Sequence, residues 1–249
     1  MSDLERYPKI IELLDKHGRE PSKEAKNFLS ELSDHHLESI EKCLSVVDIG
    51  DEPTKDWIDG FRKGTGGTTS AFAEMILLYH LRENFGEENV EMNARITEDS
   101  ESTDFDLRLP LEDDVWIEIT RRDIFNDMSE LQAGEAPEEQ VRSISDGGAG
   151  KAVDKKLMKD FKDARNELSE DKILIIGLYL EKISGQLLEV GNWLDQEYYD
   201  VTRFCDGLIA FSHMGETTKF EYYSFTDKGK KALEKLESRL GKSSENSSY

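Results

Sequence analysis

Residues 172–180 read Lys-Ile-Leu-Ile-Ile-Gly-Leu-Tyr-Leu, an almost unbroken apolar run. Such a run predicts a strand that is covered on both faces, as in a parallel sheet between layers of helices. A helix is predicted over residues 186–198, and a second buried strand over residues 207–212. Strand, helix and strand in this order imply parallel neighbours joined by a right-handed crossover. The sequence therefore predicts an α/β protein.

Two alternating segments earlier in the chain, residues 102–109 and 115–120, predict an antiparallel hairpin. Apolar residues occupy every second position, which is the period of a strand with one buried face. The connection over residues 110–114, Pro-Leu-Glu-Asp-Asp, is rich in turn formers. Together with the parallel pair, the hairpin makes the predicted central sheet mixed. One face is expected to carry Phe105, Leu107, Leu109, Val115, Ile117 and Ile119, and the other Asp104, Asp106, Arg108, Trp116, Glu118 and Thr120.

The acids of this hairpin suit a divalent cation. The predicted pairing brings Asp104 or Asp106 onto one face with Glu118, and Mg²⁺ and Mn²⁺ prefer a few hard oxygen ligands. A polar strand face that only meets solvent is the alternative interpretation. A further acid, Glu74, lies on the apolar stripe of a helix predicted over residues 71–84. A carboxylate is costly to bury there unless it is paired or bound to a cation, so Glu74 either lies at the rim of the core or has a function.

Lysines gather on one side of the helix predicted over residues 151–168. This is the best candidate in the chain for contact with a phosphate backbone. The alternative is an ordinary solvated helix face, since three aspartates lie among the lysines. The lysines opposite the apolar stripe are Lys151, Lys155, Lys159 and Lys162, with Lys156 on the flank.

Composition restricts the partners. The formal net charge of −22 gives no overall attraction to nucleic acid, so binding to DNA or RNA requires a local basic face. One explanation of this charge is a source with high internal salt, where acidic surfaces are common and charges are screened. The other explanation is an acidic surface that binds a partner. Cys43 and Cys205 are isolated, which argues against a zinc cluster or a disulfide framework and fits a reducing cytoplasm. We expect a cytoplasmic protein without a signal peptide and without a membrane-spanning segment.

The rest of the chain is predicted in coarser terms. The expected domains are a helical region over residues 1–65, a core over 70–226, and a C-terminal helix with a disordered tail over 227–249. The glycine-rich residues 64–70 lack the lysine of a phosphate loop and predict a flexible connection ending in a helix N-cap. Further predictions are a strand over 90–97, a long polar stretch over 121–150, an edge strand with Phe220, Tyr222 and Phe225, and a charged helix over 228–240.

The order of these elements over about residues 70–225 resembles the PD-(D/E)XK nuclease superfamily, with its restriction-endonuclease-like fold. In that superfamily an acid on the first core helix, an Asp in the second strand and an Asp or Glu in the third hold one or two Mg²⁺ ions. Carried over to this chain, the resemblance implies Glu74, Asp104 and Glu118, with Asp106 as the other choice for the second position. Asp104 is favoured because Ser-Thr-Asp-Phe-Asp resembles the family's Pro-Asp-Phe arrangement, although the proline is absent.

The main departure from the family concerns the lysine of its Glu-x-Lys motif, because this chain has Glu118-Ile119-Thr120. In the family that lysine activates the attacking water and stabilises the phosphate. Some members take the group from the neighbouring helix instead, where Lys151, Lys155 or Lys156 would serve. A hydroxyl carries no positive charge, so without such a substitute weak or absent catalysis is expected.

The resemblance implies a nuclease that uses Mg²⁺ or Mn²⁺ to hydrolyse phosphodiester bonds of nucleic acid, DNA in the first instance. The second hypothesis is a catalytically inactive nuclease-like fold that acts as a binding or assembly module. A third is an acidic mimic of DNA that inhibits a DNA-binding protein. Such a mimic needs carboxylates in an ordered pattern over one surface, whereas the acids here are distributed along the whole chain. A homodimer is left open.

Overall fold

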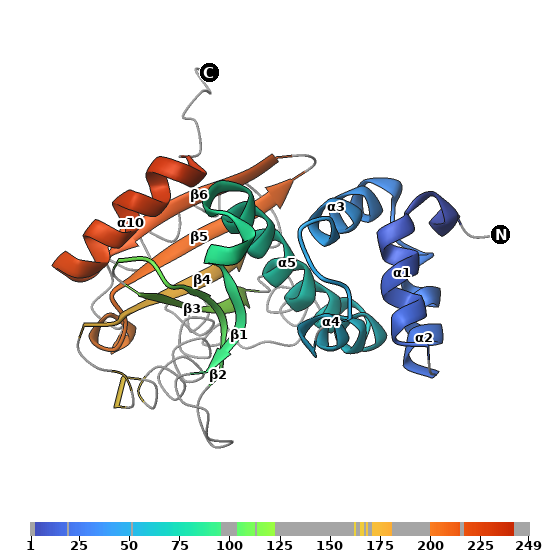
Figure 1. Ribbon diagram of the computed structural model, residues 1–249, viewed down its shortest axis with the longest axis horizontal. Coiled ribbons are helices and arrows are strands. Elements are labelled where there is room, and N and C mark those ends of the chain that lie inside the picture. The colour runs from blue at the N-terminus through green and yellow to red at the C-terminus, as the bar shows by residue number, and fades with distance from the viewer. Residues whose placement is uncertain are drawn as a thin grey trace, which may run out of the picture. The chain divides into compact units, whose positions relative to one another are not determined.

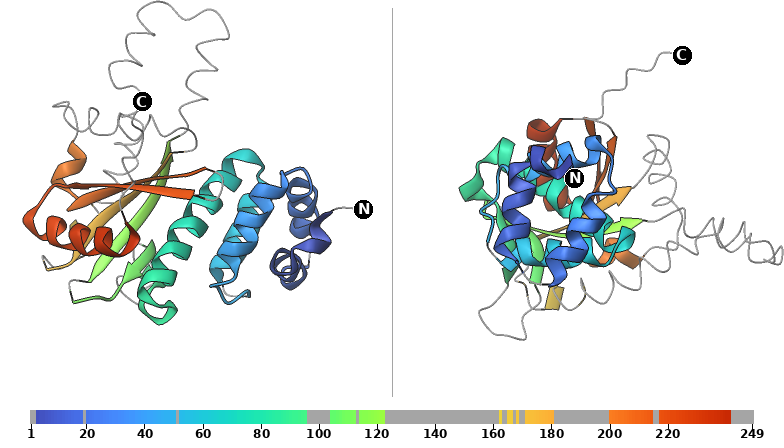
Figure 2. Two further views of the ribbon diagram at one scale, coloured as in Figure 1. Left: turned by 90° about the horizontal axis from the view of Figure 1, so that it is seen from above. Right: turned by 90° about the vertical axis from the view of Figure 1, so that its right-hand side faces the viewer.

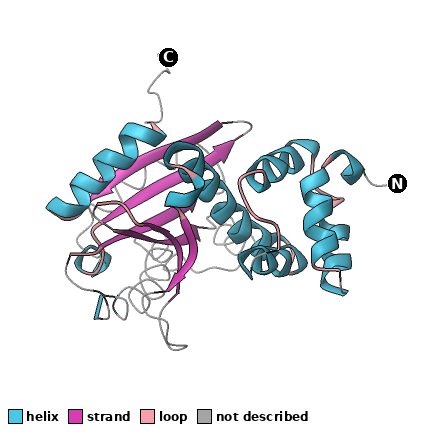
Figure 3. Ribbon diagram, viewed as in Figure 1, coloured by secondary structure: helices cyan, strands magenta, loops and turns pink. Residues whose placement is uncertain are grey.

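The computed structural model of this 249-residue chain describes residues 3–18, 20–50, 52–95, 104–112, 114–122, 162, 165, 166, 168, 171–180, 200–214 and 217–241. The chain divides into two compact units. The first comprises Met1–Asn93 with Gly215–Thr217, and the second comprises Ala94–Met214 with Thr218–Tyr249. The first unit is helical and the second is built on a β-sheet (Figure 3).

The helical unit contains the predicted N-terminal helices and one long helix that follows them. Apolar residues at spacings of three and four line the buried sides of these helices, among them Leu13, Leu29 and Leu44. The carboxylate of Glu41 accepts hydrogen bonds from the backbone N–H groups of Lys9 and Ile10, and so satisfies the start of the first helix. The helices are α1 (Pro8–Lys16), α2 (Glu20–Leu29), α3 (Asp34–Leu44), α4 (Glu52–Arg62) and α5 (Thr65–Phe85), with short 3-10 turns η1 (Asp3–Arg6) and η2 (Glu87–Asn89) (Figure 2).

The glycine-rich stretch is helical, so its prediction as a flexible connection is wrong. Helix α5 begins at Thr65, and Gly64, with φ of 78°, is its N-cap. A Cβ on Gly67 would lie 2.4 Å from the carbonyl oxygen of Gly60 in α4. The glycines therefore allow two helix backbones to touch, which outweighs their poor helix propensity.

The second unit is built on a six-stranded mixed sheet in the order β1-β2-β3-β4-β5-β6 (Figure 1). The predicted hairpin is confirmed, because β2 and β3 pair antiparallel with Leu107 opposite Ile117. The predicted parallel pair β4/β5 is confirmed as well, and β3 runs parallel to β4. The strands are β1 (Glu91–Arg95), β2 (Asp104–Leu109), β3 (Val115–Arg122), β4 (Ile173–Leu180), β5 (Gly207–Met214) and β6 (Thr217–Ser224).

All eight residues of β4 are buried, as the apolar run predicts. On one face, β4 contributes to an apolar cluster with β3 and β5, which we call the sheet cluster. On the other face, helix α10 (Asp227–Leu240) packs against β4 and β5 (Figure 2). The described members of the sheet cluster are Ala94, Phe105, Trp116, Leu168, Leu174, Ile176, Leu178, Leu180, Cys205, Leu208 and Ala210.

The predicted helix over residues 186–198, most of the lysine-bearing helix over 151–168, most of the polar stretch over 121–150 and the Ser-rich end lie outside the described residues. Among the described residues, no helix has both the length and the apolar character needed to span a membrane.

Candidate functional site

Two of the predicted acids, Asp106 and Glu118, lie directly beyond the paired residues of the hairpin. The paired register runs from Leu109 opposite Val115 to Leu107 opposite Ile117, and Asp106 and Glu118 are the next residues on the two strands. The backbone N–H of Ile119 donates a hydrogen bond of 2.6 Å to Oδ2 of Asp106. The Asp106 carboxylate therefore lies beside the peptide that joins Glu118 to Ile119, and both acids are half-buried.

Strand β2 changes face near Asp106, which corrects one prediction. Phe105 and Arg108 were expected on opposite faces, yet both contact the ring of Trp116. The rings of Phe105 and Trp116 lie 5.5 Å apart, and the guanidinium carbon of Arg108 lies 4.8 Å from the indole centroid. The strand thus loses its alternation where the Asp106 side chain, rather than the backbone, accepts the Ile119 N–H, as in a β-bulge.

The face of β3 that was expected to be polar is largely apolar. Trp116 is only 2% exposed and belongs to the sheet cluster. Glu118 is in register with Ile176 and Thr120 with Leu178, both members of that cluster. Glu118 is therefore a half-buried carboxylate at the border of an apolar surface, where an ionised group requires a hydrogen-bond donor or a cation.

Glu74 lies in the helical unit, on α5, and is half-buried. Its Oε2 accepts a hydrogen bond of 2.8 Å from Nε1 of Trp57, which is 2% exposed. This indole explains how α5 tolerates a carboxylate among its apolar residues. The strand acids belong to the sheet unit, so the set Glu74, Asp104 and Glu118 stays a prediction.

Other predicted site residues are placed only in part. Asp104 is the first residue of β2, and its side chain lies outside the described part of the structure. Lys162 is helical and exposed, as expected for a lysine on the solvated side of its helix. Lys151, Lys155, Lys156 and Lys159 lie outside the described residues.

The donor set of Asp106 and Glu118 fits Mg²⁺ or Mn²⁺ in its chemistry, since both side chains offer carboxylate oxygens. Two carboxylates with part of the water shell are enough for Mg²⁺, which is often bound through one or two. Within the described ranges, no three His, Cys, Asp or Glu side chains gather as a metal-binding group. Of the predicted centre, the described residues thus place the Asp106 carboxylate beside the backbone that follows Glu118.

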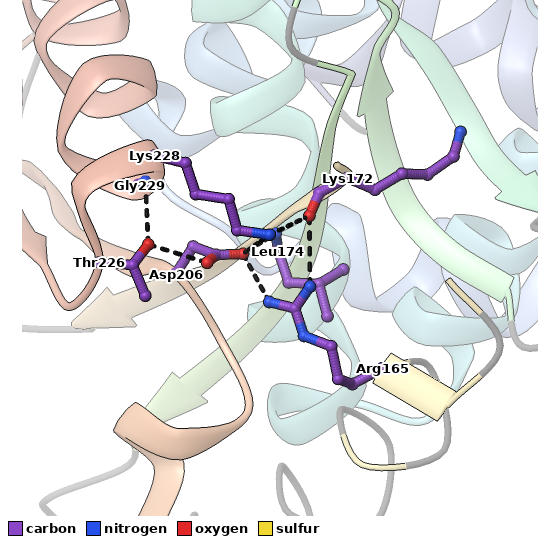
Figure 4. A network of polar contacts seen from close by, with 7 residues as sticks. All are labelled: Arg165, Lys172, Leu174, Asp206, Thr226, Lys228 and Gly229. Carbon is purple, nitrogen blue, oxygen red and sulfur yellow. Dashed lines mark hydrogen bonds and ion pairs between the residues drawn. The ribbon is translucent and has the colours of Figure 1, made fainter. Parts of the chain in front are cut away.

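A second polar cluster, which the sequence did not predict, surrounds Asp206. This residue is 1% exposed and accepts on both carboxylate oxygens (Figure 4). Oδ2 accepts from Arg165 Nη2 at 2.6 Å and from the backbone N–H of Leu174 at 3.0 Å, and Oδ1 accepts from Thr226 Oγ1 at 2.9 Å. Lys228 Nζ lies 3.5 Å from Oδ2 and donates to the carbonyl of Lys172 at 2.8 Å.

These contacts, together called the Asp206 network, join the start of β4, the start of β5 and helix α10. Thr226 is the N-cap of α10, and its Oγ1 accepts from the backbone N–H of Gly229 at 3.0 Å. A Cβ on Gly229 would lie 1.9 Å from the carbonyl oxygen of Asp206, so only glycine fits there. The network therefore fixes helix α10 against the sheet.

A neighbouring group of three charges joins β2, the start of β3 and the start of β4. Asp114 accepts from Arg108 Nε at 2.7 Å and from Lys172 Nζ. Burial raises the pKa of Asp114, but the hydrogen bonds and charges of Arg108 and Lys172 outweigh this effect and lower it. Lys172 Nζ also lies 5.3 Å from the ring centroid of Trp116.

A single pattern unites the two clusters: Asp114, Lys172 and Asp206 each come directly before one of the parallel strands β3, β4 and β5. In the sequence, the signal that could have predicted these clusters is a charged residue immediately before each buried strand. These residues lie at the amino ends of the strands, whereas ligands of open α/β sheets bind at the carboxyl ends. We therefore assign the Asp206 network to stability, and the candidate site to Asp106 and Glu118.

Comparison with known proteins gives no relative from which to transfer a function. The chain matches no protein-family model, no curated protein and no solved structure.

Proposed function

We propose that this protein is a metal-dependent nuclease that hydrolyses phosphodiester bonds of nucleic acid, DNA in the first instance. The observation that carries the proposal is the hydrogen bond from the Ile119 N–H to Asp106, which holds one carboxylate beside the residue that bears the next. The strand order, with an antiparallel hairpin followed by parallel strands, supports the resemblance to the PD-(D/E)XK superfamily.

The chain's own residues have distinct roles in this proposal. Asp106 and Glu118 would hold Mg²⁺ or Mn²⁺, with Asp104 and Glu74 as further ligands. When bound, such an ion lowers the pKa of its water and stabilises negative charge on phosphate. Thr120 donates at most a neutral hydrogen bond, so Lys151 or Lys155 supplies the positive charge beside the phosphate. Lys159 and Lys162 contact the nucleic acid backbone.

A binding module without catalysis is the second candidate, and Thr120 is the observation that favours it. A threonine at the position of the family's lysine carries no positive charge. In that case the protein binds a partner through the same surface but cleaves nothing. The nuclease proposal also includes a nucleic acid interface on the lysine-bearing helix and a location in the cytoplasm.

The test is Glu118→Ala, assayed for Mg²⁺-dependent cleavage of plasmid and single-stranded DNA. We expect cleavage to fall by about 100-fold or more, the scale seen when one preorganised electrostatic group is removed from an active site. Glu112→Ala is the matched control, because Glu112 is exposed in the turn between the same two strands. Circular dichroism checks that both variants fold.

Calorimetric titration with Mn²⁺ separates the two candidates. A nuclease centre gives saturable binding that Glu118→Ala abolishes and Glu112→Ala preserves. Equal cleavage by wild type and Glu118→Ala contradicts the nuclease assignment. A wild-type protein that neither binds Mn²⁺ nor cleaves DNA leaves the binding module as the remaining candidate.

A further inference from the structure

Helix α10 carries cations along one flank of its exposed side. Lys231, Lys235 and Arg239 recur every fourth residue, and all three are exposed. Each step of four residues turns the helix by about 40° and advances it by about 6 Å, so the three side chains form a row. We call these three residues the α10 row. Glu234 and Glu237 lie on the other flank of the exposed side.

This order of charges does not serve the stability of the helix. Lys235 has Lys231 four residues before it and Arg239 four residues after it, and like charges at this spacing repel. No acid lies three or four residues from Lys235 or Arg239 in the sequence. Within the part of the chain that the structure describes, none of the three forms an ion pair. The α10 row is therefore available to an anion from outside the chain.

The sheet unit places the α10 row away from the hairpin acids. A Cβ on Gly207 would lie 2.6 Å from Cδ1 of Leu233 and 3.3 Å from Cδ1 of Ile175, so α10 covers that face of β4 and β5. Glu118 is in register with Ile176, a member of the sheet cluster on the other face. A ligand on the α10 row is therefore not the group that would react at Asp106 and Glu118.

We propose that the α10 row binds the phosphate backbone of nucleic acid, duplex DNA in the first instance. Duplex DNA carries about one negative charge per 1.7 Å of its axis, so a regular row of cations meets phosphates along its whole length. Contacts of this kind carry no base-specific information, and binding is expected to be independent of sequence. The choice of DNA rests on the proposed function, but the surface is a different one and no hydrolysis is needed.

Two observations favour nucleic acid over other anionic partners. A helix that binds a membrane surface buries its apolar face among the lipids, whereas Ala232, Leu233 and Leu236 of α10 are already buried within the protein. The carboxylates of an acidic protein follow no fixed interval, whereas phosphates repeat regularly, as the α10 row does.

The net charge of −22 opposes the approach of DNA. At physiological ionic strength the Debye length is about 8 Å, so distant acids are screened while cations in contact with phosphate remain effective. A local row of cations can therefore bind a polyanion although the whole chain is acidic.

The experiment measures the dissociation constant for a short labelled DNA duplex by fluorescence anisotropy, in EDTA so that no metal-dependent cleavage occurs. Replacing all three residues of the α10 row by glutamine should weaken binding about 100-fold at physiological salt, from a salt slope of about 0.9 for each lost phosphate contact. The matched control, Lys23→Gln/Lys26→Gln/Lys63→Gln, removes the same charge from exposed lysines of the helical unit and should change the constant only a few-fold.

Two single variants test which flank of α10 binds. Lys235→Gln should weaken binding about fivefold and reduce the magnitude of the salt slope by about one. Lys230→Gln, on the other flank of the same helix, should leave both nearly unchanged. Because Lys235→Gln removes repulsion within the helix, urea denaturation should show no loss of stability. Lys235→Arg keeps the charge and should bind as the wild type does.

Equal binding by the wild type and the triple variant of the α10 row overturns the proposal, as does an equal loss in the control triple. A wild-type protein that does not bind the duplex overturns it as well. Anionic vesicles are titrated in parallel, and binding to vesicles but not to DNA would assign the row to a membrane surface instead. If DNA binds through the α10 row but Mg²⁺-dependent cleavage is absent, this inference stands and the nuclease proposal fails.

Discussion

The two units of this protein use glycine for the same geometric purpose but depend on different forces. In the helical unit, Gly60 and Gly67 let the backbones of α4 and α5 touch, and the contact involves shape alone. In the sheet unit, Gly229 lets α10 approach the carbonyl of Asp206, whose carboxylate binds Arg165 and Thr226. The helical contact is therefore sensitive to volume alone, and the contact of α10 is sensitive to both volume and charge.

The largest effect is expected from Asp206→Ala in the sheet unit. Removing this buried carboxylate leaves the Leu174 N–H and the Thr226 hydroxyl without their acceptor, and the partly exposed Arg165 and Lys228 without their counter-charge, which costs on the order of 3 kcal/mol of unfolding free energy. Urea denaturation measures the loss. Glu234→Ala, which removes an exposed acid from α10, is the control and should change stability little. Equal stability of the two variants would show that the network contributes nothing.

Overpacking the helical contact should have an intermediate effect. Gly67→Ala places a Cβ against the carbonyl of Gly60 and should destabilise the protein by about 1–3 kcal/mol. Gly60→Ala should cost less, because its Cβ would lie 2.9 Å from the facing carbonyl rather than 2.4 Å. Elsewhere in a helix, alanine for glycine stabilises by about 0.5–1 kcal/mol. A stabilising Gly67→Ala, measured by urea denaturation, would contradict the close contact.

The smallest effect is a difference in acid sensitivity between the units. Burial, assisted by the charge of Lys42, lowers the pKa of His80 from 6.5 to about 4. The folded state therefore favours neutral His80. The contribution of this group to the stability of the folded state is complete above pH 6.5 and is lost as the pH falls towards 4. We expect a loss of about 1 kcal/mol at pH 5, reduced from the full linkage value by partial exposure.

Asp114 supplies the opposite case in the sheet unit. Its pKa is lowered below 3.8, so its stabilisation is present above that pH and is lost only below it. Hydrogen exchange read by peptide mass spectrometry at pH 7 and 5, corrected for the intrinsic exchange rate, should show weaker protection in α5 and little change in β3. His80→Gln should remove the change in α5. An unchanged pH response in that variant would assign it to another group.

Much of the fold was predictable because apolar patterning determines burial. The continuous run of β4 and the alternation of β2 and β3 identified a mixed sheet with the correct hairpin. The glycine-rich start of α5 was mispredicted, because local propensity favours a loop. The contact of Gly67 with Gly60 of the preceding helix α4, which propensity does not include, favours the helix.

The candidate site was predictable only in part. Alternation predicted an acid of β2 on one face with Glu118, and the structure shows Asp106 beside the peptide that joins Glu118 to Ile119. Alternation cannot foresee that β2 changes face at Asp106, since the cause is a single side-chain hydrogen bond. The Asp206 network escaped prediction for a related reason. Arg165, Asp206 and Lys228 are far apart in the sequence, and only the packing of α10 on the sheet unites them.

The indole of Trp116 has a practical consequence. It lies between Phe105 and two cations, Arg108 and Lys172, that also bind Asp114. Fluorescence of an indole responds to nearby charge, so the emission of Trp116 is a built-in optical reporter for the amino end of β3. Replacing Trp57 and Trp193 by phenylalanine would isolate that signal, and pairing Trp57→Phe with Glu74→Gln would avoid leaving the Glu74 carboxylate without its donor.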